Sequence, residues 1–356
     1  MTPRTAIEER KLDHIDINLR RNVEPSGLKT GFERLQFKSN ALPELSLDRV
    51  DTTVEFLGTR LAAPVLISSM TGGVERGWEI TRRLAGAAQA LGCAIGVGSQ
   101  RAALEHWERA AFFEVRSIAP DALLFANIGA VQLNYGYTVD ECRRAVEMIG
   151  ADGLFLHLNP LQEALQADGD TDFTDLARKI EAICRQLDVP VIVKEVGFGI
   201  SATAAIRLAN CGVSAIDVSG SGGTSWSAVE HLRCADEQRR QISRAFLGWG
   251  IPTARCLIDV RRSLPDMTLL ASGGMRTGVD VAKALALGAN LAGIAGPLLR
   301  AAAIGEEAAH TALQSIITEL RIAMFAVGAP NTAALGRDLL FELDAPILGF
   351  AEKSLP

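Results

Sequence analysis

The sequence is poor in aromatic residues and shows no excess of basic charge. Aromatic side chains make up 5% of the 356 residues, and 36 Lys+Arg are outnumbered by 42 Asp+Glu, which gives a net charge of −6. This balance argues against a general nucleic-acid binder and is compatible with a local cationic pocket for a small anion. Hydrophobic residues reach 48%, so small and aliphatic side chains can build a large core and disorder is not expected.

Cysteine pairs, a signal peptide and a long apolar run are missing as well. The six cysteines include no CxxC pair and no metal-type spacing, which predicts reduced thiols in the core. The first 16 residues carry too many charges for a signal peptide. The longest apolar stretch, 284–299, stays below 18 residues and contains Gly, Asn and Pro. We therefore expect a soluble, cytoplasmic protein without a membrane or nucleic-acid partner.

Short apolar runs recur along the chain and predict the fold class. The eight runs cover 63–69, 93–99, 122–127, 153–159, 189–195, 214–220, 267–274 and 291–297. Seven are followed by a polar or glycine-rich loop and a helical pattern, which predicts a parallel sheet with helical crossovers. Eight such units match an α/β fold of the (β/α)8 TIM-barrel type. A doubly wound open sheet is the alternative, but "GVGSQR" (96–101) lacks the third glycine of a GxGxxG turn and follows the second run.

We expect the whole chain, 1–356, to form a single barrel domain. An N-terminal arm (1–60) precedes the barrel core (61–302), and helices are expected to follow it (303–356). The segment 225–262, between the sixth and seventh strands, is an unusually long insertion. Long insertions of this kind in barrels are commonly functional, and this one is expected to include a lid.

Polar residues gather at the C-terminal ends of the apolar runs. They lie in the segments Ser69-Met70-Thr71; Ser99-Gln100-Arg101; Asn127; His157 and Asn159; Lys194-Glu195; Ser219; and Ser272. A barrel builds its active site from these strand ends, whereas core strands have no need of polar tips on one side. The pattern therefore predicts one polar mouth on an apolar barrel.

Glycine-rich loops follow the last three strands. They read "SGSGGTSW" (219–226), "ASGGMRTG" (271–278) and "AGPLLRAA" (295–302). Glycines let the backbone approach a ligand, and a helix N-terminus offers N–H groups to an anion. In barrels the last two loops commonly bind phosphate, so the set suggests a phosphorylated cofactor; tight turns without a ligand are the alternative.

Lys194 would be costly inside a barrel without a negative partner. A reduced flavin, which carries negative charge at its N1–C2 edge, is one such partner. Pairing with Glu163 or Asp217 is the structural alternative.

A second anion site is suggested by cations near the mouth. Arg101 follows the second strand, and Arg10 and Lys11 lie in the N-terminal arm together with His14. An Arg-Lys pair near a terminus is by itself also typical of solvated surface. Glu163 lies just past a strand tip, where one carboxylate with phosphate oxygens and water could hold Mg²⁺.

The segment "HLNPLQE" (157–163) combines an apolar strand with four polar residues. Period-two alternation places Phe155, His157 and Asn159 toward the barrel interior and the three intervening leucines toward the helices. Pro160 then ends the strand, so Gln162 and Glu163 fall in the loop above the mouth. His157 alone could also be a satisfied core histidine.

Several motifs resemble the type 2 isopentenyl-diphosphate isomerases. They are "RKLDHI" (10–15), "MTGG" (70–73), "GVGSQR" (96–101), "ANIGA" (126–130), "HLNPLQE" (157–163), "KEVGFGIS" (194–201), "GGTSW" (222–226), "ASGGMRTG" (271–278) and "ELRIAMFAVGAPNTAAL" (319–335). The resemblance runs in order from about residue 8 to 345. "HLNPLQE" and "RKLDHI" are its most specific parts, because other FMN barrels share the glycine loops.

This resemblance implies an FMN-dependent, Mg²⁺-requiring enzyme of isoprenoid biosynthesis that interconverts isopentenyl and dimethylallyl diphosphate. It implies reduced FMN acting in acid–base catalysis without net oxidation, NADPH only as the reductant that primes the flavin, and a homo-oligomer (tetramer or octamer). Shifting this double bond passes through tertiary-cation character, so the site must also exclude water.

The resemblance also implies roles for individual residues. The FMN contacts would be Ser69, Met70, Thr71, Ser99, Asn127, Lys194, Ser219, Thr224, Gly273, Gly274, Met275, Ala295 and Gly296. The diphosphate contacts would be Arg10, Lys11, Ser99, Gln100, Arg101 and Gln162. Glu163 would hold the metal. The catalytic candidates are His157, Gln162, His14 and Asn159. Two positions depart from the family pattern: Ser221 stands where alanine is expected, and Gly248 where aspartate is expected.

An FMN-dependent 2-hydroxy-acid oxidase or dehydrogenase is the main alternative. That chemistry needs a histidine base near the late glycine loops, and none of the five histidines (14, 106, 157, 231 and 310) adjoins them. A non-catalytic phosphate-binding barrel is a further alternative, but it would not need the polar set at 157–163.

Overall fold

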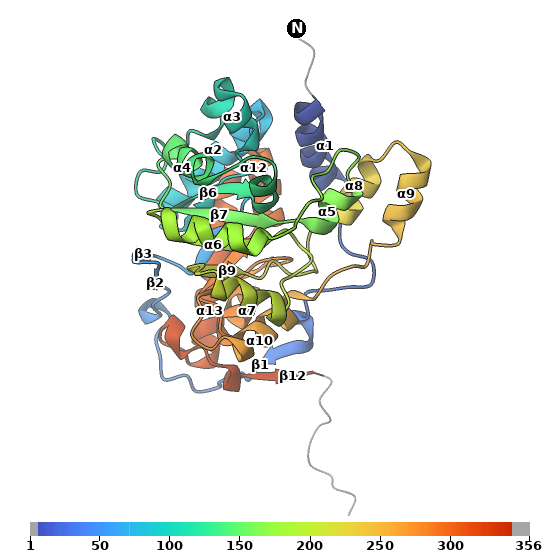
Figure 1. Cartoon of the computed structure of the whole chain (residues 1–356). Coiled ribbons are helices and arrows are strands. Elements are labelled where there is room, and N and C mark those ends of the chain that lie inside the picture. The colour runs from blue at the N-terminus through green and yellow to red at the C-terminus, as the bar shows by residue number, and fades with distance from the viewer. Residues whose placement is uncertain (1–5, 71, 344–356) are drawn as a thin grey trace, which may run out of the picture.

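The computed structural model describes residues 6–70 and 72–343, and its centre is a closed barrel of eight parallel strands (Figure 1). The barrel strands are β4 (Val65–Ile67), β5 (Ala94–Gly96), β6 (Leu124–Gly129), β7 (Gly153–Leu158), β8 (Val191–Glu195), β9 (Ala215–Asp217), β10 (Leu269–Ala271) and β11 (Leu291–Ile294). Each pairs with its neighbours in chain order, and β11 closes the ring by pairing with β4. Each barrel strand therefore begins within one of the eight apolar runs, although β6 extends two residues past its run, and the (β/α)8 prediction is confirmed.

Side chains alternate between the interior and the exterior of the barrel along each strand. On β7, Phe155 belongs to the interior cluster that also includes Phe125 and Ile192, whereas Leu154 and Leu156 pack in the layer under the helices. This is the inside–outside alternation that a period of two residues predicts. The polar end of each strand is therefore aimed at one rim of a well-packed barrel.

Helices surround the barrel and connect its strands. They are α2 (Glu75–Leu91), α3 (Arg101–Glu105), α4 (Val139–Ile149), α5 (Pro160–Leu165), α6 (Leu176–Gln186), α7 (Ala202–Asn210), α10 (Thr253–Ser263), α11 (Gly278–Ala286), α12 (Gly296–Ile304) and α13 (Glu306–Val327). Local chemistry sets their ends. Thr138 and Glu141 form a reciprocal capping box at the start of α4, and Gly150, with φ of 58°, ends it.

The C-terminal segment is less helical than expected. Gly305 divides the apolar region after β11 into two helices, α12 and α13, and α13 ends at Gly328 in the left-handed conformation. Two 3-10 turns (Thr332–Ala334 and Arg337–Leu339) and the strand β12 (Leu340–Glu342) follow. The prediction of helices through 303–356 is therefore wrong for 328–343, and 344–356 lie outside the described residues.

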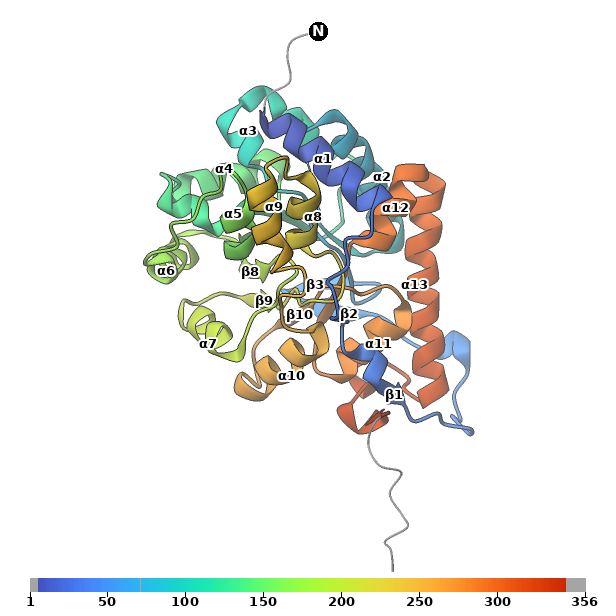
Figure 2. The same ribbon diagram turned by 90° about the vertical axis from the view of Figure 1, so that its right-hand side faces the viewer.

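The N-terminal arm contributes at both ends of the barrel (Figure 1), and Figure 2 looks onto the end that carries its first helix. Helix α1 (Ala6–Arg20) lies at the mouth, and β1 (Leu35–Phe37), preceded by the turn Phe32–Arg34, pairs antiparallel with β12. After the turn Leu47–Arg49, the hairpin of β2 (Val54–Phe56) and β3 (Thr59–Leu61) inserts Phe56 and Leu61 into the interior cluster at the opposite end. The hairpin thus closes the barrel where the strands begin.

The insertion after β9 forms two short helices, α8 (Trp226–Arg233) and α9 (Glu237–Arg244). Helix α8 lies beside α1 and α5 at the mouth, and α9 packs on α8 (Figure 1). The last part of the predicted insertion, from Thr253, is α10, an ordinary outer helix of the barrel. In the part of the chain that the structure describes, no helix has the length and apolar character needed to cross a bilayer.

Candidate active site

A cavity of about 510 Å³ opens at the C-terminal end of the barrel, under α1. Its described lining brings together the predicted residues Arg10, Lys11, His14, Ser69, Met70, Ser99, Arg101, Asn127, His157, Asn159, Gln162, Glu163, Lys194, Ser219, Thr224, Gly273, Gly274, Met275, Ala295 and Gly296. Residues from the N-terminal arm and from all eight strand ends thus meet in one place. Thr71, predicted to contact the cofactor, lies outside the described residues.

Gln100 is the predicted ligand-binding residue that the structure places elsewhere. Its side chain is fully buried, donates to the carbonyl oxygen of Ala145 (2.8 Å) and accepts from the backbone N–H of Asn127 (2.9 Å). Both ends of the amide therefore hold β6 and α4 beside the start of α3, and the residue is absent from the cavity lining. The prediction that Gln100 contacts the diphosphate is not supported by this geometry.

His157 occupies the top of the barrel interior beside Asn127. The Nδ1 atom of His157 lies 2.9 Å from Oδ1 of Asn127, whose Nδ2 donates to the carbonyl of Val97 (3.0 Å). Because the Asn127 oxygen must accept, the proton of the neutral imidazole is on Nδ1, and Nε2 keeps its lone pair. Burial, with the charge of Lys194, lowers the pKa of His157 to about 3. His157 is therefore neutral at physiological pH.

Lys194 and Asp217 are paired in register across β8 and β9, next to His157 on β7. Both are buried, and Ser272 donates its hydroxyl to the Asp217 carboxylate (2.8 Å). Burial lowers the pKa of Lys194, and Asp217 opposes that shift. Of the two carboxylates that the sequence offered as partners for Lys194, the structure brings Asp217 close to it.

Glu195, the next residue after Lys194, holds the loop above β8. Its carboxylate accepts hydrogen bonds from four consecutive backbone N–H groups, 196–199, at 2.5–3.2 Å. Burial raises the pKa of Glu195 to about 7, although these bonds act in the opposite direction. The carbonyl oxygen of Glu195 also accepts from Nζ of Lys194 at 2.6 Å. This loop thereby fixes the lysine in the cavity wall.

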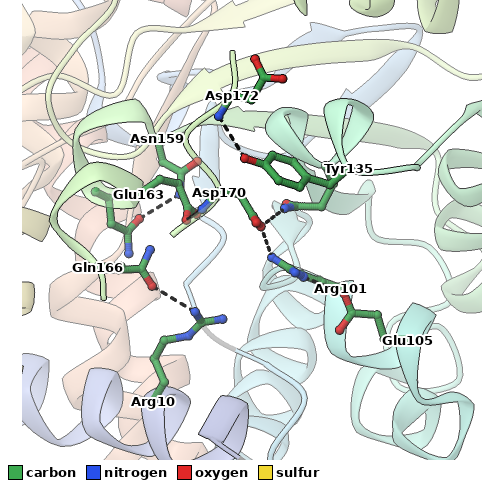
Figure 3. A network of polar contacts seen from close by, with 11 residues as sticks. Arg10, Arg101, Glu105, Tyr135, Asn159, Glu163, Gln166, Asp170 and Asp172 are labelled. Carbon is green, nitrogen blue, oxygen red and sulfur yellow. Dashed lines mark hydrogen bonds and ion pairs between the residues drawn. The ribbon is translucent and has the colours of Figure 1, made fainter. Parts of the chain in front are cut away.

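Three cations from two helices line the other part of the cavity. Lys11 of α1 donates to the carbonyl oxygens of Gly72 (2.5 Å) and Ser99 (3.3 Å), and burial lowers its pKa to about 7. Arg10, one residue earlier, donates to Gln166 Oε1 (3.1 Å). Arg101 begins α3 and extends toward the segment after α5 (Figure 3). Positive charge is concentrated on this side of the cavity.

Glu163 lies in α5 with its carboxylate held by two donors. Asn159 Nδ2 donates to one oxygen (2.7 Å) and the backbone N–H of Asp170 donates to the other (2.9 Å; Figure 3). Among residues 6–70 and 72–343, no group of three His, Cys, Asp or Glu side chains could hold a metal by itself. This donor set fits Mg²⁺ only if phosphate oxygens and water complete its coordination.

Glu230 is a buried carboxylate at the site that was not predicted from the sequence. It lies in α8, 3% exposed, where Oε1 accepts from His14 Nε2 (3.1 Å) and Gln162 Nε2 (3.3 Å). Burial raises its pKa, but the hydrogen bond and charge of His14, with Arg233, bring it below its usual value. Glu230 lies within a helix of the insertion, so the strand-end pattern gave no signal for it.

In the glycine-rich loops, close packing of one loop backbone on another requires glycine. A Cβ on Gly273 would lie 2.0 Å from the carbonyl of Gly220, and one on Gly223 would lie 2.5 Å from the nitrogen of Gly274. The tight-turn interpretation therefore accounts for these glycines without a ligand. Gly296 differs, because a Cβ there would lie 3.5 Å or more from its nearest neighbour, an Arg300 nitrogen. Its opening at the N-terminus of α12 is suited to an anion.

Orphaned hydroxyls mark where a polar ligand fits. The Oγ atoms of Ser68 and Ser69 are buried at the cavity wall with no hydrogen-bond partner, and such groups are costly unless a ligand or water pairs with them. A Cβ on Gly293 would lie 2.5 Å from Ser68 Oγ, so the absence of a side chain at Gly293 leaves the space beside this hydroxyl free. Together with Lys194 and the N-terminus of α12, these donors are consistent with the FMN that the sequence predicts.

Of the two departures from the family pattern, Gly248 lies in the insertion (225–262) and Ser221 lies just before it, in the loop after β9. Ser221 Oγ is buried without a hydrogen-bond partner. A Cβ at Gly248 would lie 2.6 Å from the carbonyl of Ser26, so this backbone has no room for the expected aspartate.

The fold and the cavity define a (β/α)8 barrel with a polar mouth, and comparison with known families places it among FMN-dependent barrels. A profile of the FMN-dependent dehydrogenase family matches residues 150–342. Similar solved structures include a flavocytochrome b2 variant with sulfite bound (TM-score 0.69, 20% identity, 95% of this chain and 85% of that one) and a mandelate oxidase mutant with a monooxide FMN adduct (TM-score 0.62, 21% identity, 88% and 89%). At these identities the likeness concerns the fold alone.

Relatives of higher identity define the family more closely. The isopentenyl-diphosphate delta-isomerase of Synechocystis sp. is 51% identical over 94% of this chain and 95% of its own length. That of Stutzerimonas stutzeri is 50% identical over 96% and 99%. The chain belongs to the isopentenyl-diphosphate delta-isomerase family.

Proposed function

We propose that this protein is an isomerase that interconverts isopentenyl and dimethylallyl diphosphate with FMN and Mg²⁺. The observation that carries the proposal is the joining of two clusters in one cavity. One cluster consists of the cations Arg10, Lys11 and Arg101 beside Glu163, and the other consists of Lys194 with unpaired hydroxyls at the barrel rim. A diphosphate and a flavin would each have a complementary part of the site.

FMN would be held by the strand ends and by the late loops. Ser68 and Ser69 offer unpaired hydroxyls, Lys194 offers a buried cation, and the N-terminus of α12 at Gly296 offers N–H groups to the phosphate. Reduced FMN supplies an electron-rich ring that can exchange a proton, and NADPH would serve to reduce it. Because His157 Nδ1 is tied to Asn127, its Nε2 remains available at the cavity as a hydrogen-bond acceptor.

The diphosphate would bind on the side of α1, α3 and α5. Arg10 and Arg101 supply guanidinium groups, which match phosphate oxygens in a bidentate way, and Lys11 supplies an ammonium that a bound anion would favour over the neutral amine. Glu163 would contribute its carboxylate to Mg²⁺, with diphosphate oxygens and water at the remaining positions.

The chain's own polar groups would handle protons close to the substrate. Glu230, with its lowered pKa, is ionised at neutral pH and accepts from both His14 Nε2 and Gln162 Nε2. It thereby fixes these two catalytic candidates in one orientation, while Asn159 is fixed by Glu163. The helices α1 and α8 lie over the cavity and would exclude the water that could trap a carbocation.

A 2-hydroxy-acid oxidase remains the rival activity because its fold is similar. Its chemistry needs a histidine base, and the histidine in the strand ends of this cavity is His157, whose pKa of about 3 makes it a very weak base. His14, at the mouth, is hydrogen-bonded to Glu230 and belongs to the diphosphate side. The isomerase proposal accounts for both histidines.

One assay separates these activities. The purified holoenzyme is reduced without oxygen, isopentenyl diphosphate and Mg²⁺ are added, and the product is followed by NMR. We expect dimethylallyl diphosphate without net flavin oxidation. Absence of that product, or anaerobic reduction of the flavin by a 2-hydroxy acid such as lactate, would overturn the proposal.

A further inference from the structure

The loop between α5 and α6 places the carboxylate of Asp170 between Arg101, the proposed diphosphate ligand, and Glu163, the proposed metal ligand. Asp170 Oδ2 accepts hydrogen bonds from Arg101 Nη1 and from Gln132 Nε2, the latter at 2.8 Å. The backbone N–H of the same residue donates to Glu163 Oε2 at 2.9 Å. Figure 3 shows Asp170 between Arg101 and Glu163, in contact with both. Neither the strand-end pattern nor the proposed chemistry assigns a role to Asp170.

The backbone of this loop packs directly against the backbone of α5 at Gly169. A Cβ at Gly169 would lie 1.9 Å from the carbonyl oxygen of Glu163. Only glycine fits at such a distance, and the close approach is what brings the next N–H within reach of the Glu163 carboxylate. A further hydrogen bond holds the loop two residues later, where the hydroxyl oxygen of Tyr135 accepts from the backbone N–H of Asp172 (3.1 Å).

Arg101 is held by carboxylates on two sides. Its Nε donates to Glu105 Oε1 (2.7 Å) and its Nη1 to Asp170. Burial lowers the pKa of Arg101, but these two acids outweigh it and raise the value. A long arginine side chain otherwise loses conformational entropy when it binds an anion, and orienting it beforehand reduces that cost.

We propose that Asp170 is a positioning residue that couples the anion-binding Arg101 to the metal-binding Glu163. The proposal rests on the proposed function, which assigns the diphosphate to Arg101 and Mg²⁺ to Glu163. Through its side chain Asp170 fixes the guanidinium, and through its backbone it fixes the carboxylate. A magnesium-bound diphosphate therefore meets both groups in a single arrangement.

The test measures binding of inorganic diphosphate to the FMN-loaded protein by titration calorimetry, with and without Mg²⁺. Asp170→Asn keeps the backbone donor and the size of the side chain but removes the charge that fixes Arg101. We expect it to raise the Kd for magnesium diphosphate by about tenfold, whereas FMN content and melting temperature stay unchanged. Asp172→Asn is the matched control, because the Asp172 carboxylate accepts from the N–H of Thr174 (2.9 Å) in the same loop; its Kd should equal that of the wild type.

A double-mutant cycle tests whether Asp170 acts through Arg101. In an Arg101→Gln background, Asp170→Asn should add little to the loss of affinity. In turnover, Asp170→Asn should raise KM for isopentenyl diphosphate more than it lowers kcat.

Three results would overturn the inference: unchanged affinity in Asp170→Asn, tighter binding, which would make Asp170 a competitor of the anion, or full additivity with Arg101→Gln. If the wild type itself binds no diphosphate and makes no product, the proposed function fails instead. The two failures are therefore distinguishable.

Discussion

At the scale of single residues, the site depends on polar groups that the fold leaves incompletely paired. Ser68 and Ser69 have buried hydroxyls without partners, and Lys11 and Lys194 have pKa values lowered by burial. Unpaired polar groups and buried cations are unfavourable in the free protein. They are explained if anions and a polar cofactor complete them, and this explanation can be tested residue by residue.

Glu163→Gln should weaken Mg²⁺ activation and leave FMN bound. The amide keeps the shape of the side chain but supplies no charge to the metal, and even outer-shell changes at metal sites cost about 10- to 100-fold. We expect the Mg²⁺ concentration for half-maximal activity to rise at least about tenfold. Flavin absorbance measures the FMN content of the same sample, and substitution of the exposed Glu306 at the start of α13 (Glu306→Gln) is the control. Loss of FMN from the Glu163 variant would contradict the assignment.

Lys11 should make diphosphate binding depend on pH. Because burial brings its pKa to about 7, the amine loses its proton as pH rises through 7, and a bound anion favours the protonated form. Binding at pH 8.5 should therefore take up a proton at Lys11, and affinity should fall as pH rises from 7. Calorimetry in two buffers of different ionisation enthalpy measures this uptake. The Lys11→Gln variant measures the proton uptake that comes from the diphosphate itself. Equal proton uptake by the variant and the wild type would contradict the prediction.

At the scale of elements, close helix packing fixes the loops that carry the site. A Cβ on Gly278, at the start of α11, would lie 2.2 Å from the carbonyl of Ile316 in α13. A Cβ on Gly86, inside α2, would have its nearest neighbour at 4.0 Å. Substitution by alanine should therefore have opposite effects on stability at these two glycines.

Gly278→Ala should destabilise the protein, whereas Gly86→Ala should not. Overpacking of this kind costs about 1–3 kcal/mol, and alanine in place of an uncrowded helical glycine gains up to about 1 kcal/mol. Urea unfolding of the two variants against the wild type measures both. A Gly278→Ala variant as stable as the wild type would show that α11 and α13 can separate without cost.

The sequence predicted elements where chemistry is local and missed those that depend on distant contacts. The barrel strands and the polar strand ends follow from the two-residue period and from strand-to-helix alternation. The pairing of β1 with β12 joins segments some 300 residues apart, and no local pattern announces it. Glu230 and Asp170 were missed for the same reason, because the contacts on which their proposed roles rest come from other elements. The family resemblance placed Gln100 at the diphosphate, but its amide is hydrogen-bonded to the backbone of β6 and α4.

At the scale of the whole molecule, the cavity joins parts that would respond to different ligands. The late loops, after β9 and β10, lie on the proposed FMN side, whereas α1 and the segment 163–172 lie on the proposed diphosphate side. A ligand stabilises the segments that bind it against local opening. Each ligand should therefore leave its own pattern on one folded protein.

Hydrogen exchange should resolve these two patterns. FMN alone should slow amide exchange in 219–224 and 272–277, and addition of inorganic diphosphate with Mg²⁺ should then slow exchange in α1 and 163–172. At a ligand concentration of 100 Kd the gain in stability is about 2.7 kcal/mol. For segments that open only after the ligand has dissociated, amide exchange should therefore slow by about a hundredfold. Mass spectrometry of peptides from the apo, FMN-loaded and doubly loaded protein measures it, with the β2–β3 hairpin as the remote control. If FMN alone protected α1 and 163–172 as strongly as both ligands together, the assignment of the anion site to these segments would be wrong.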